Sequence, residues 1–583
     1  MLKTEPQACF VSQSHERWFC GFRGHVFATA VGEVGPVLAE VEAAVGRGLF
    51  AAGYLAYEAA PGLSPELSVR QHDPSLPLAW FGLYETLETV DRRWHPAEPY
   101  AVRRWTPNMQ KGAYQGAVQR IRAYLEAGDS YQVNFTFSLT AQFHGSPEAW
   151  FQALCRAQQA EYCAYLDLGR FQILSASPEL FFRLDGDLLE TRPMKGTRRR
   201  SPDPVEDARL RDELAASSKD RAENLMIVDL LRNDMGRISR TGSVEVTDLF
   251  RVEPYRTVWQ MTSSVKSKTR ATVTEIMRSL FPCGSVTGAP KVRAMQIIRE
   301  LEQVPRGVYC GTVGYWLPGR KAQFNVAIRT ATIDVATGFA RYGVGSGITW
   351  DSDAGAEFEE CLAKTAMLDV ADGGVELVET LLFNGSYFLL HRHLARLAAS
   401  ADFFGFCIDI EQVQNALMNA SASMPPGAQK VRLRVSRFGA LSIEQTPAIT
   451  SDCIRLAISE TPIDEHDVFL HHKTTRRGVY NRAMAAHPGA DDVLLWNRRG
   501  EITETCFGNI VADIAGKLVT PPVHCGLLPG TMRADLLERG LIGEMVIKRE
   551  DISMANGLYM INSVRKWVPV KLLSALKSAF QHA

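Results

Sequence analysis

The chain has 583 residues, a length that suits roughly two to four ordinary domains. Hydrophobic residues make up 46% and charged residues 22%, which excludes a disordered, collagen-like or coiled-coil protein. The 64 Lys and Arg residues nearly balance the 65 Asp and Glu residues, so the formal net charge of -1 gives no overall attraction to nucleic acid or to a membrane surface.

The N-terminal sequence and the cysteines bear on location. No long apolar stretch follows Met1-Leu2-Lys3, so we expect no secretory signal. No window approaches about 18 uninterrupted apolar residues, the length that a membrane-spanning helix needs. The 11 cysteines form no CxxC pair and no regular framework, which is typical of reduced thiols in a cytoplasmic protein.

In chain order, the first part mixes helices and strands without regular βαβ alternation, which indicates an α+β domain. The patterns predict helices over 112–127, 219–231, 291–302 and 358–370, and strands over 171–175, 307–315 and 324–333.

A change of pattern near residue 372, at Ala371-Asp372-Gly373-Gly374, predicts a domain boundary. We therefore expect one domain over residues 1–371 and a second over 375–583. The second begins with alternating residues 375–383, a turn at Asn384-Gly385 and a short apolar run at 387–390, which together predict a hairpin.

Side chains suited to catalysis gather in three stretches of the first part. Glu179 and Lys195 come near the ends of consecutive predicted strands, although an isolated pair of this kind is more often a salt bridge. Two carboxylate pairs share an i, i+3 spacing, which puts each pair on one helix face: Asp220 with Glu223, and Glu357 with Glu360. Alone, such pairs are more often solvated, but two pairs that converge would suit Mg²⁺, a hard cation that takes oxygen ligands.

Taken together, these segments resemble the chorismate-utilising enzyme family. The resemblance runs from about residue 110 to 370 through the strings at 128–135, 219–234, 284–291, 327–330 and 343–348. It implies an antiparallel β-sandwich with helices. Members that aminate chorismate at C4 typically carry Lys at the second position after the Pro of the motif Pro193-Met194-Lys195-Gly196-Thr197, as this chain does, whereas anthranilate synthases typically carry Ala.

The resemblance also implies roles for individual residues. Glu179 would protonate the departing 4-hydroxyl as general acid, and Lys195 would add to the ring as nucleophile. The four carboxylates would hold Mg²⁺ against the ring carboxylate of chorismate. The residues implied in substrate binding are Thr287, Tyr309, Arg329, Gly343, Gly345 and Gly347. One departure is Gln260, which stands where many relatives have His.

Amination needs ammonia, which a glutamine amidotransferase usually supplies. The chain shows neither the Gly-flanked nucleophilic Cys nor the His-x-Glu pair of such a domain. A separate glutamine amidotransferase subunit is therefore the expected partner, with free ammonia as the alternative.

The second part offers the minimal set of groups for pyridoxal phosphate: a lysine, an anion-binding turn and a carboxylate. The order and content of its motifs across most of 375–570 resemble those of proteins with the class IV, D-amino acid aminotransferase-like fold, which has two subdomains. By this resemblance Lys473 binds the cofactor aldehyde and Glu504 pairs with the pyridine nitrogen. The residues implied around the phosphate are Arg396, Gly530, Thr531, Met532, Asn562 and Ser563. Such proteins generally dimerise, so we expect a homodimer through this domain.

The two resemblances imply one sequence of reactions. Chorismate and ammonia would give 4-amino-4-deoxychorismate, and elimination of pyruvate would then give 4-aminobenzoate, toward folate. The second step rests on analogy of fold and fusion. Three alternatives stay open: a second part that is an amino-acid transaminase, a first part that is an anthranilate or isochorismate synthase, and a half that is a non-enzymatic scaffold.

Overall fold

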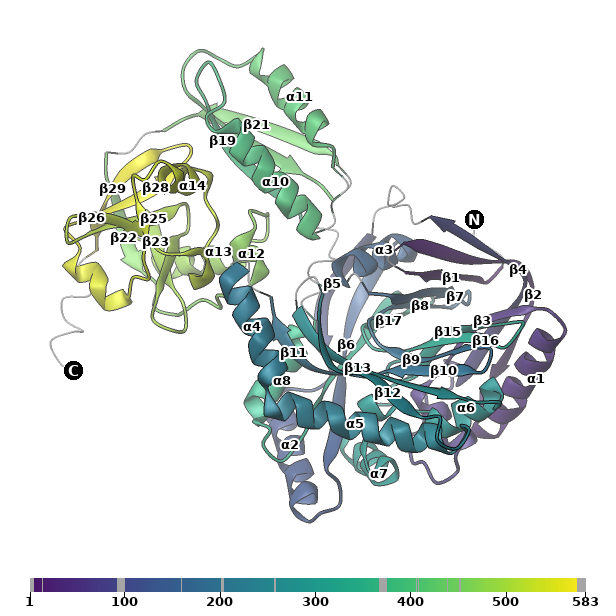
Figure 1. Ribbon diagram of the computed structural model, residues 1–583. Coiled ribbons are helices and arrows are strands. Elements are labelled where there is room, and N and C mark those ends of the chain that lie inside the picture. Colours follow the sequence, from purple (N-terminus) through teal and green to yellow (C-terminus); the bar gives the residue numbers. More distant parts are fainter. Residues whose placement is uncertain are drawn as a thin grey trace. The chain divides into compact units, whose positions relative to one another are not determined.

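The protein, seen here as a computed structural model, is described over residues 5–12, 14–91, 100–158, 160–200, 204–255, 258–365, 368, 375–404, 406, 408–437, 439–449 and 452–573. The chain divides into two compact units, Met1–Arg200 with Ala208–Gly373 and Gly374–Ala583 with the short segment Ser201–Asp207 (Figure 1). The predicted boundary segment itself, 371–374, lies outside the described residues.

The first unit is built on one continuous antiparallel sheet system of 18 strands. Its strands are β1 (Gln7–Val11), β2 (His15–Ala28), β3 (Phe50–Leu55), β4 (Ala79–Asp91), β5 (Tyr100–Pro107), β6 (Gln132–Gly145), β7 (Tyr162–Asp167), β8 (Phe171–Ser177), β9 (Leu180–Asp185), β10 (Leu188–Arg192), β11 (Met194–Arg199), β12 (Glu245–Pro254), β13 (Val258–Lys268), β14 (Gly288–Ala289), β15 (Thr312–Leu317), β16 (Lys321–Val326), β17 (Thr330–Asp334) and β18 (Phe339–Ile348). Its α-helices are α1 (Val34–Gly46), α2 (Lys111–Glu126), α3 (Pro147–Gln158), α5 (Ser218–Gly236), α6 (Val273–Leu280), α7 (Lys291–Leu301) and α8 (Ala354–Ala363), together with α4 (Pro204–Ala216) from Ala208 onward.

Strands β3 and β15, with the first half of β4, are buried on both faces, which makes this unit a sandwich. On one face Tyr54 and Trp80 pack with Phe10 of β1 and Ile173 of β8, so two strand layers meet there. This arrangement is how sheets with alternating inward residues exclude water. The antiparallel sandwich that the sequence implied is confirmed.

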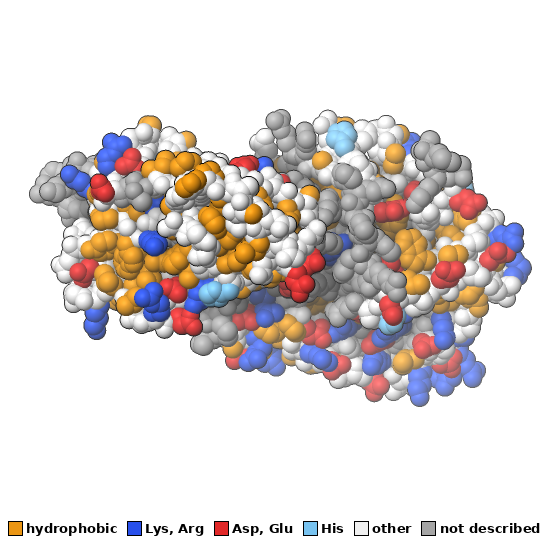
Figure 2. All heavy atoms as spheres, turned by 90° about the horizontal axis from the view of Figure 1, so that it is seen from above, with side chains coloured by type: hydrophobic (Ala, Val, Ile, Leu, Met, Phe, Trp, Pro, Cys, Tyr) orange, Lys and Arg blue, Asp and Glu red, His pale blue; other side chains and the backbone are white. Residues whose placement is uncertain are grey.

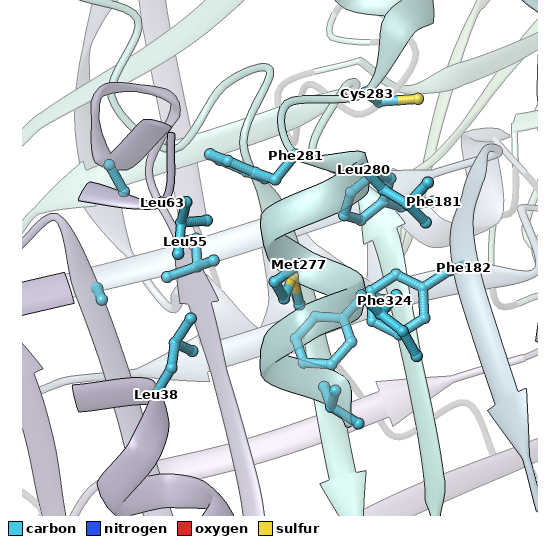
Figure 3. Close-up of a cluster of buried hydrophobic side chains, with 14 of the residues drawn as sticks. Leu38, Leu55, Leu63, Phe181, Phe182, Met277, Leu280, Phe281, Cys283 and Phe324 are labelled. Carbon is cyan, nitrogen blue, oxygen red and sulfur yellow. The ribbon is translucent and has the colours of Figure 1, made fainter. Parts of the chain in front are cut away.

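The other face of the same strands packs against helices. Figure 3 shows Leu38 of α1 and Met277 of α6 directed toward Leu55 of β3 and toward Phe182 and Phe324 of β9 and β16. Helix α6 presents an apolar face because Val273, Ile276, Met277 and Leu280 recur with helical spacing, and Thr272 caps its N-terminus through the backbone N–H of Glu275.

The second unit has two subdomains, as the resemblance implied. A three-stranded antiparallel sheet is formed by β19 (Leu377–Phe383), β20 (Gln429–Val435) and β21 (Leu441–Pro447), with the helices α10 (Leu390–Phe404) and α11 (Ile410–Ser421). A mixed eight-stranded sheet is formed by β22 (Ile454–Ile458), β23 (Asp492–Trp496), β24 (Ile502–Thr505), β25 (Asn509–Ile514), β26 (Lys517–Thr520), β27 (Gly543–Glu544), β28 (Gly557–Asn562) and β29 (Lys566–Leu572). The remaining helices are α12 (Val468–His471), α13 (Gly478–Ala486) and α14 (Thr531–Glu538).

Three predicted elements are wrong. The strand expected over 307–315 starts only at Thr312, since Cys310 has a φ of 64° and the chain turns there. The strand expected over 324–333 is broken into β16 and β17 where Arg329 has a φ of 53°. The expected hairpin is reduced to one antiparallel bridge between Phe383 and Tyr387: after Leu389, with a φ of 56°, the chain enters α10, and β19 pairs along its length with β20. The helix expected over 358–370 begins four residues earlier, at Ala354, and 366, 367, 369 and 370 lie outside the described residues.

The surface agrees with the balanced charge. On the face shown in Figure 2, acidic and basic side chains are interspersed rather than segregated by sign. Within the described part of the chain, no helix combines the length and the apolar character that crossing a membrane would require.

Candidate active sites

Glu179 lies in the turn between β8 and β9 and is almost fully buried, with 2% of its surface exposed. Its backbone N–H donates to Ser177 Oγ at 3.2 Å and its carbonyl accepts from Val326 N–H at 3.1 Å, so the ends of β8 and β16 hold it. Burial raises the pKa of Glu179 to about 7, against smaller opposing effects of Ser285 and Lys195. The carboxyl is thus poised to give up a proton near neutral pH.

Lys195 projects from β11 toward β18, a strand with glycine at positions 343, 345 and 347. A Cβ added at Gly347 would lie 3.0 Å from Lys195 Nζ, and one added at Gly343 would overlap the ring of Tyr309. Gly345 is crowded in the same way by Phe135 and Thr136 of β6. The three alternate glycines therefore share one face of β18, and side chains from other elements occupy the space that their own side chains would fill.

The four predicted metal-binding carboxylates come from α5 and α8. Asp220 Oδ2 accepts from Arg198 Nη2 at 2.9 Å, and Glu360 Oε1 pairs with Lys364 Nζ at 2.8 Å. Glu357 Oε1 accepts from Ser352 Oγ at 2.8 Å, and Glu223 Oε2 lies 3.4 Å from Gln132 Nε2.

The fit of this group to Mg²⁺ is partial. Burial raises the pKa of Glu223, with smaller contributions from Asp220 and Glu357, so a divalent cation would relieve concentrated negative charge. Within the described ranges, however, no three His, Cys, Asp or Glu side chains lie close enough together to hold a metal. Because Asp220 and Glu360 already have cationic partners, the donor chemistry fits a cation best beside Glu223 and Glu357.

Gln260, the departure from the family pattern, makes two hydrogen bonds through its side-chain amide. Its Nε2 donates to the carbonyl of Gly196 at 2.8 Å, and its Oε1 accepts from Thr197 Oγ1 at 3.0 Å. The ladder between β11 and β13 shifts register between Met194 and Thr197, which is where Lys195 lies. The Gln260 amide therefore bridges the irregular part of the strand that carries the lysine.

The predicted substrate-binding residues are only partly brought together. Tyr309 packs on Gly343, and the two line a small cavity with Thr330 of β17 and Arg306. The Thr287 hydroxyl is used locally, since it donates to the carbonyl of Cys283 at 3.2 Å. Arg329 donates to the carbonyl of Lys364.

In the second unit, Lys473 and Glu504 form the centre of the predicted cofactor site. Burial, together with the charges of Arg396 and Arg477, lowers the pKa of Lys473 to about 8. Burial raises the pKa of Glu504 to about 8, and Tyr480 donates to Glu504 Oε1 at 2.6 Å. Each of Lys473 and Glu504 acts electrostatically on the other, so the two predicted residues share one site.

The predicted phosphate residues converge on β19. Arg396 donates to both carboxylate oxygens of Glu379, at 2.9 and 2.7 Å, and to the carbonyl of Pro529 at 3.2 Å. Thr531 Oγ1 lies 3.3 Å from His393 Nε2, and Ser563 Oγ donates to the Thr380 carbonyl at 3.3 Å.

The N-terminus of α14 completes this group. Gly530 is its N-cap residue, and a side chain there would overlap the Asn509 amide. The backbone N–H groups that open the helix, beside Arg396, suit an anion. Met532 packs instead into a hydrophobic cluster, and Asn562 Oδ1 accepts from two N–H groups of its own turn. An amine, an anion cradle and a buried carboxyl fit pyridoxal phosphate in chemistry.

Sequence reasoning missed two residues of this site, Glu379 and His393. Burial alone would raise the pKa of Glu379, but Arg396 and His393 lower it to about 2. His393 Nδ1 lies 2.6 Å from Glu379 Oε2 and links it to Thr531. The spacing of His393 and Arg396 on one helix face was the available signal, but an acid in an apolar strand gave no hint of its partners.

Comparisons with known proteins match two families to two segments of the chain. Residues 33–369, more than half of the chain, match the chorismate binding enzyme family, and residues 376–573 match the class IV amino-transferase family. Aminodeoxychorismate synthase component 1 of Klebsiella aerogenes is 43% identical over 262 residues, which are 45% of this chain and 58% of that protein. Anthranilate synthase component 1 of Streptomyces coelicolor is 40% identical over 277 residues, 47% of this chain and 54% of that protein.

Among solved structures, anthranilate synthase component I from Streptococcus pneumoniae TIGR4 aligns with a TM-score of 0.50 at 28% identity, covering 54% of this chain and 80% of that one. The chain spans little more than half the length of the curated relatives that it matches. The family match, the sandwich and the placement of Glu179 and Lys195 lead to one conclusion: the chain belongs to the chorismate binding enzyme family and carries a class IV amino-transferase domain after it.

Proposed function

We propose that the chain converts chorismate and ammonia to 4-amino-4-deoxychorismate in its first unit, and that its second unit eliminates pyruvate to release 4-aminobenzoate for folate synthesis. The observation that carries the proposal is Lys195, whose Nζ lies against Gly347 within electrostatic reach of the buried Glu179. An amine nucleophile and a carboxylic acid close together beside the glycines of β18 suit replacement of a ring hydroxyl.

In the first unit, Glu179 in its protonated form gives its proton to the 4-hydroxyl, which leaves as water while Lys195 Nζ bonds to the ring. Ammonia then attacks C4, and the bond from Nζ to the ring breaks. Tyr309 and the N–H groups along Gly343–Gly347 would bind the substrate, with Arg329 and Thr287 as further candidates. If Mg²⁺ takes part, Glu223 and Glu357 would be its primary protein ligands, with Asp220 and Glu360 beside them.

In the second unit, pyridoxal phosphate would supply an electron sink for the elimination. Lys473 would hold the cofactor aldehyde and, once the substrate amine replaces it, take up the proton that leaves the ring. Glu504 would keep the pyridine nitrogen protonated, and Arg396 with Gly530, Thr531 and Ser563 would hold the phosphate, with Met532 and Asn562 as neighbours.

The partners and location belong to the same proposal. A separate glutamine amidotransferase subunit would supply ammonia, in keeping with the "component 1" in the names of similar proteins. We propose a homodimer through the second unit and a cytoplasmic site of action, where the ten cysteine thiols that the structure describes would stay reduced.

One experiment tests both units. The purified chain is mixed with chorismate, Mg²⁺, pyridoxal phosphate and an ammonium salt at mildly basic pH, and the aromatic product and pyruvate are measured. Equal amounts of 4-aminobenzoate and pyruvate are expected. The ortho isomer would exclude the assignment of the first unit, whereas accumulation of 4-amino-4-deoxychorismate would exclude that of the second and call for a transaminase assay.

A further inference from the structure

The second unit holds a cation for which the proposed chemistry has no use. Arg477 is the N-cap residue of α13 and is half-buried beside the cofactor site, since its charge acts on both Lys473 and Glu504. It follows Lys473 by four residues, and the proposed chemistry gives it no contact with the substrate or with the cofactor.

Contacts on three sides fix the position of the guanidinium. Arg477 Nη2 donates to the Cys506 carbonyl at 2.6 Å. The guanidinium carbon lies 4.6 Å from the ring centre of Tyr480, whose hydroxyl binds Glu504, and 5.7 Å from the ring centre of Phe507. Stacking on aromatic faces leaves the donors at the edge of a guanidinium available.

Arg477 also lacks a carboxylate partner at ion-pair distance among the residues that the structure describes. Among the ion pairs between described residues, none involves it, whereas the neighbouring cofactor-site residue Arg396 is paired with Glu379. A half-buried guanidinium in such a setting is suited to accept a carboxylate in two parallel hydrogen bonds.

The aromatic neighbours indicate what such a carboxylate would be attached to. Phe507 is 49% exposed, so Arg477 reaches from the buried Tyr480 to the surface of the unit. A flat ring could pack on Phe507 while its amine approaches Lys473. In the substrate of the proposed lyase, the amine and the ring carboxylate lie at opposite ends of a six-membered ring, whereas an α-amino acid carries both groups on one carbon.

We propose that Arg477 binds the ring carboxylate of the substrate, with Phe507 packing on the ring, and that this pair selects a cyclic para-amino acid over an α-amino acid. The inference rests on the proposed lyase function and goes beyond it by naming a residue that determines specificity. Arg477 binds the substrate and takes no part in proton transfer.

The test compares two ligands that differ only in the carboxylate. Binding of 4-aminobenzoate and of aniline to the full chain loaded with pyridoxal phosphate is measured by calorimetry. In R477Q we expect the preference for 4-aminobenzoate to fall about 10- to 100-fold, the effect of removing a charged hydrogen-bond partner. Affinity for aniline should not change, and R477K should lie between the two proteins. Binding of 4-aminobenzoate in the first unit would be the same in both chains, so their difference reports on the second unit.

The matched control is R476Q. Arg476 is the adjacent arginine and lies over Phe469, 4.7 Å from its ring centre, so this variant should bind both ligands like the wild type. With 4-amino-4-deoxychorismate supplied, R477Q should raise KM with little change in kcat.

Two results would overturn the inference while leaving the lyase intact. One is an R477Q chain that keeps the preference for 4-aminobenzoate. The other is a variant with unchanged KM but an altered cofactor spectrum, which would assign Arg477 to the cofactor. Failure of the proposed function would look different, because the wild-type chain itself would then release no 4-aminobenzoate from chorismate.

Discussion

The two units each bring one lysine close to one buried glutamate, but the charged groups around the two lysines differ. Around Lys195 the charged neighbours are mainly carboxylates, Glu179, Glu223 and Glu360 among them. Around Lys473 burial is the main cause that lowers the pKa of the amine; the guanidiniums of Arg396 and Arg477 add to it, and the carboxylates of Glu379 and Glu504 oppose it. The comparison teaches that one residue type serves two reactions through its surroundings: carboxylates gather around the first lysine, whereas burial and two guanidiniums lower the pKa of the second.

Removing each lysine is the strongest test of this comparison. K195A should lose amination of chorismate by at least about a thousandfold, because the nucleophile is gone. K473A should instead let 4-amino-4-deoxychorismate accumulate with no 4-aminobenzoate. Chromatography of the products distinguishes the two, and 4-aminobenzoate from K473A would disprove the assignment of the second unit.

The proton on Glu179 gives the next largest effect. Because burial raises the pKa of Glu179 to about 7, its acid form is present below that pH and is lost as pH rises through it. The rate of amination, divided by the concentration of free NH₃, should therefore fall above about pH 7. E179Q should lower the rate of amination about 100-fold or more, and the rate of this variant should no longer fall above about pH 7.

A matched control exists for that variant. Glu58 also has a pKa of about 7 through burial, but it accepts from the N–H groups of Arg306 and Gly307 at 2.7 and 2.9 Å. E58Q should lower stability and leave the pH profile in place. A profile that shifts equally in both variants would show that the fall of the rate at higher pH does not come from Glu179.

Gln260 should have a smaller effect on the first site. Q260A removes the amide that bridges Gly196 and Thr197, so Lys195 would be held less firmly, and we expect about a tenfold lower kcat with little change in KM. Q172A is a suitable comparison, because Gln172 binds Asp167 at 3.2 Å on another strand pair. Equal losses in both variants would mean that Gln260 matters only for folding.

The smallest effect is expected at Tyr480 in the second site. The Tyr480 hydroxyl opposes the rise in the pKa of Glu504, so Y480F should raise that pKa further. A smaller fraction of Glu504 would then be ionised and able to pair with the cofactor nitrogen. A loss of cofactor affinity of a few-fold is expected, in line with one hydrogen bond. Fluorescence titration with pyridoxal phosphate measures it, and unchanged affinity would separate Tyr480 from the cofactor site.

The sequence predicted most of the fold where patterns are local. Helices expected over 112–127, 219–231 and 291–302 appear as α2, α5 and α7 with ends within a few residues, because apolar spacing and polar ends specify a helix locally. The errors lie where non-glycine residues adopt a positive φ, at Cys310, Arg329 and Leu389. Nothing in local composition marks such positions, because packing against distant strands imposes them.

The site was predictable in its residue types and less so in its contacts. The spacing of Asp220 with Glu223 put both on one helix, but it could not show that Arg198 binds Asp220. Likewise, the motif around Lys473 did not point to Glu379, which lies 94 positions earlier and meets the site only through β19 and α10. Pairings across long stretches of chain depend on tertiary structure, which short motifs do not encode.

The glycine face of β18 has a consequence for how this enzyme can change. Glycine is the smallest residue, so no substitution at 343, 345 or 347 can widen the space above the strand. Each possible mutation there adds atoms where Tyr309, Thr136 or Lys195 already lies. Mutation of these glycines can therefore only reduce the space above β18 and narrow the range of accepted substrates. A wider range, in evolution or by engineering, requires changes in the side chains of other elements around that space.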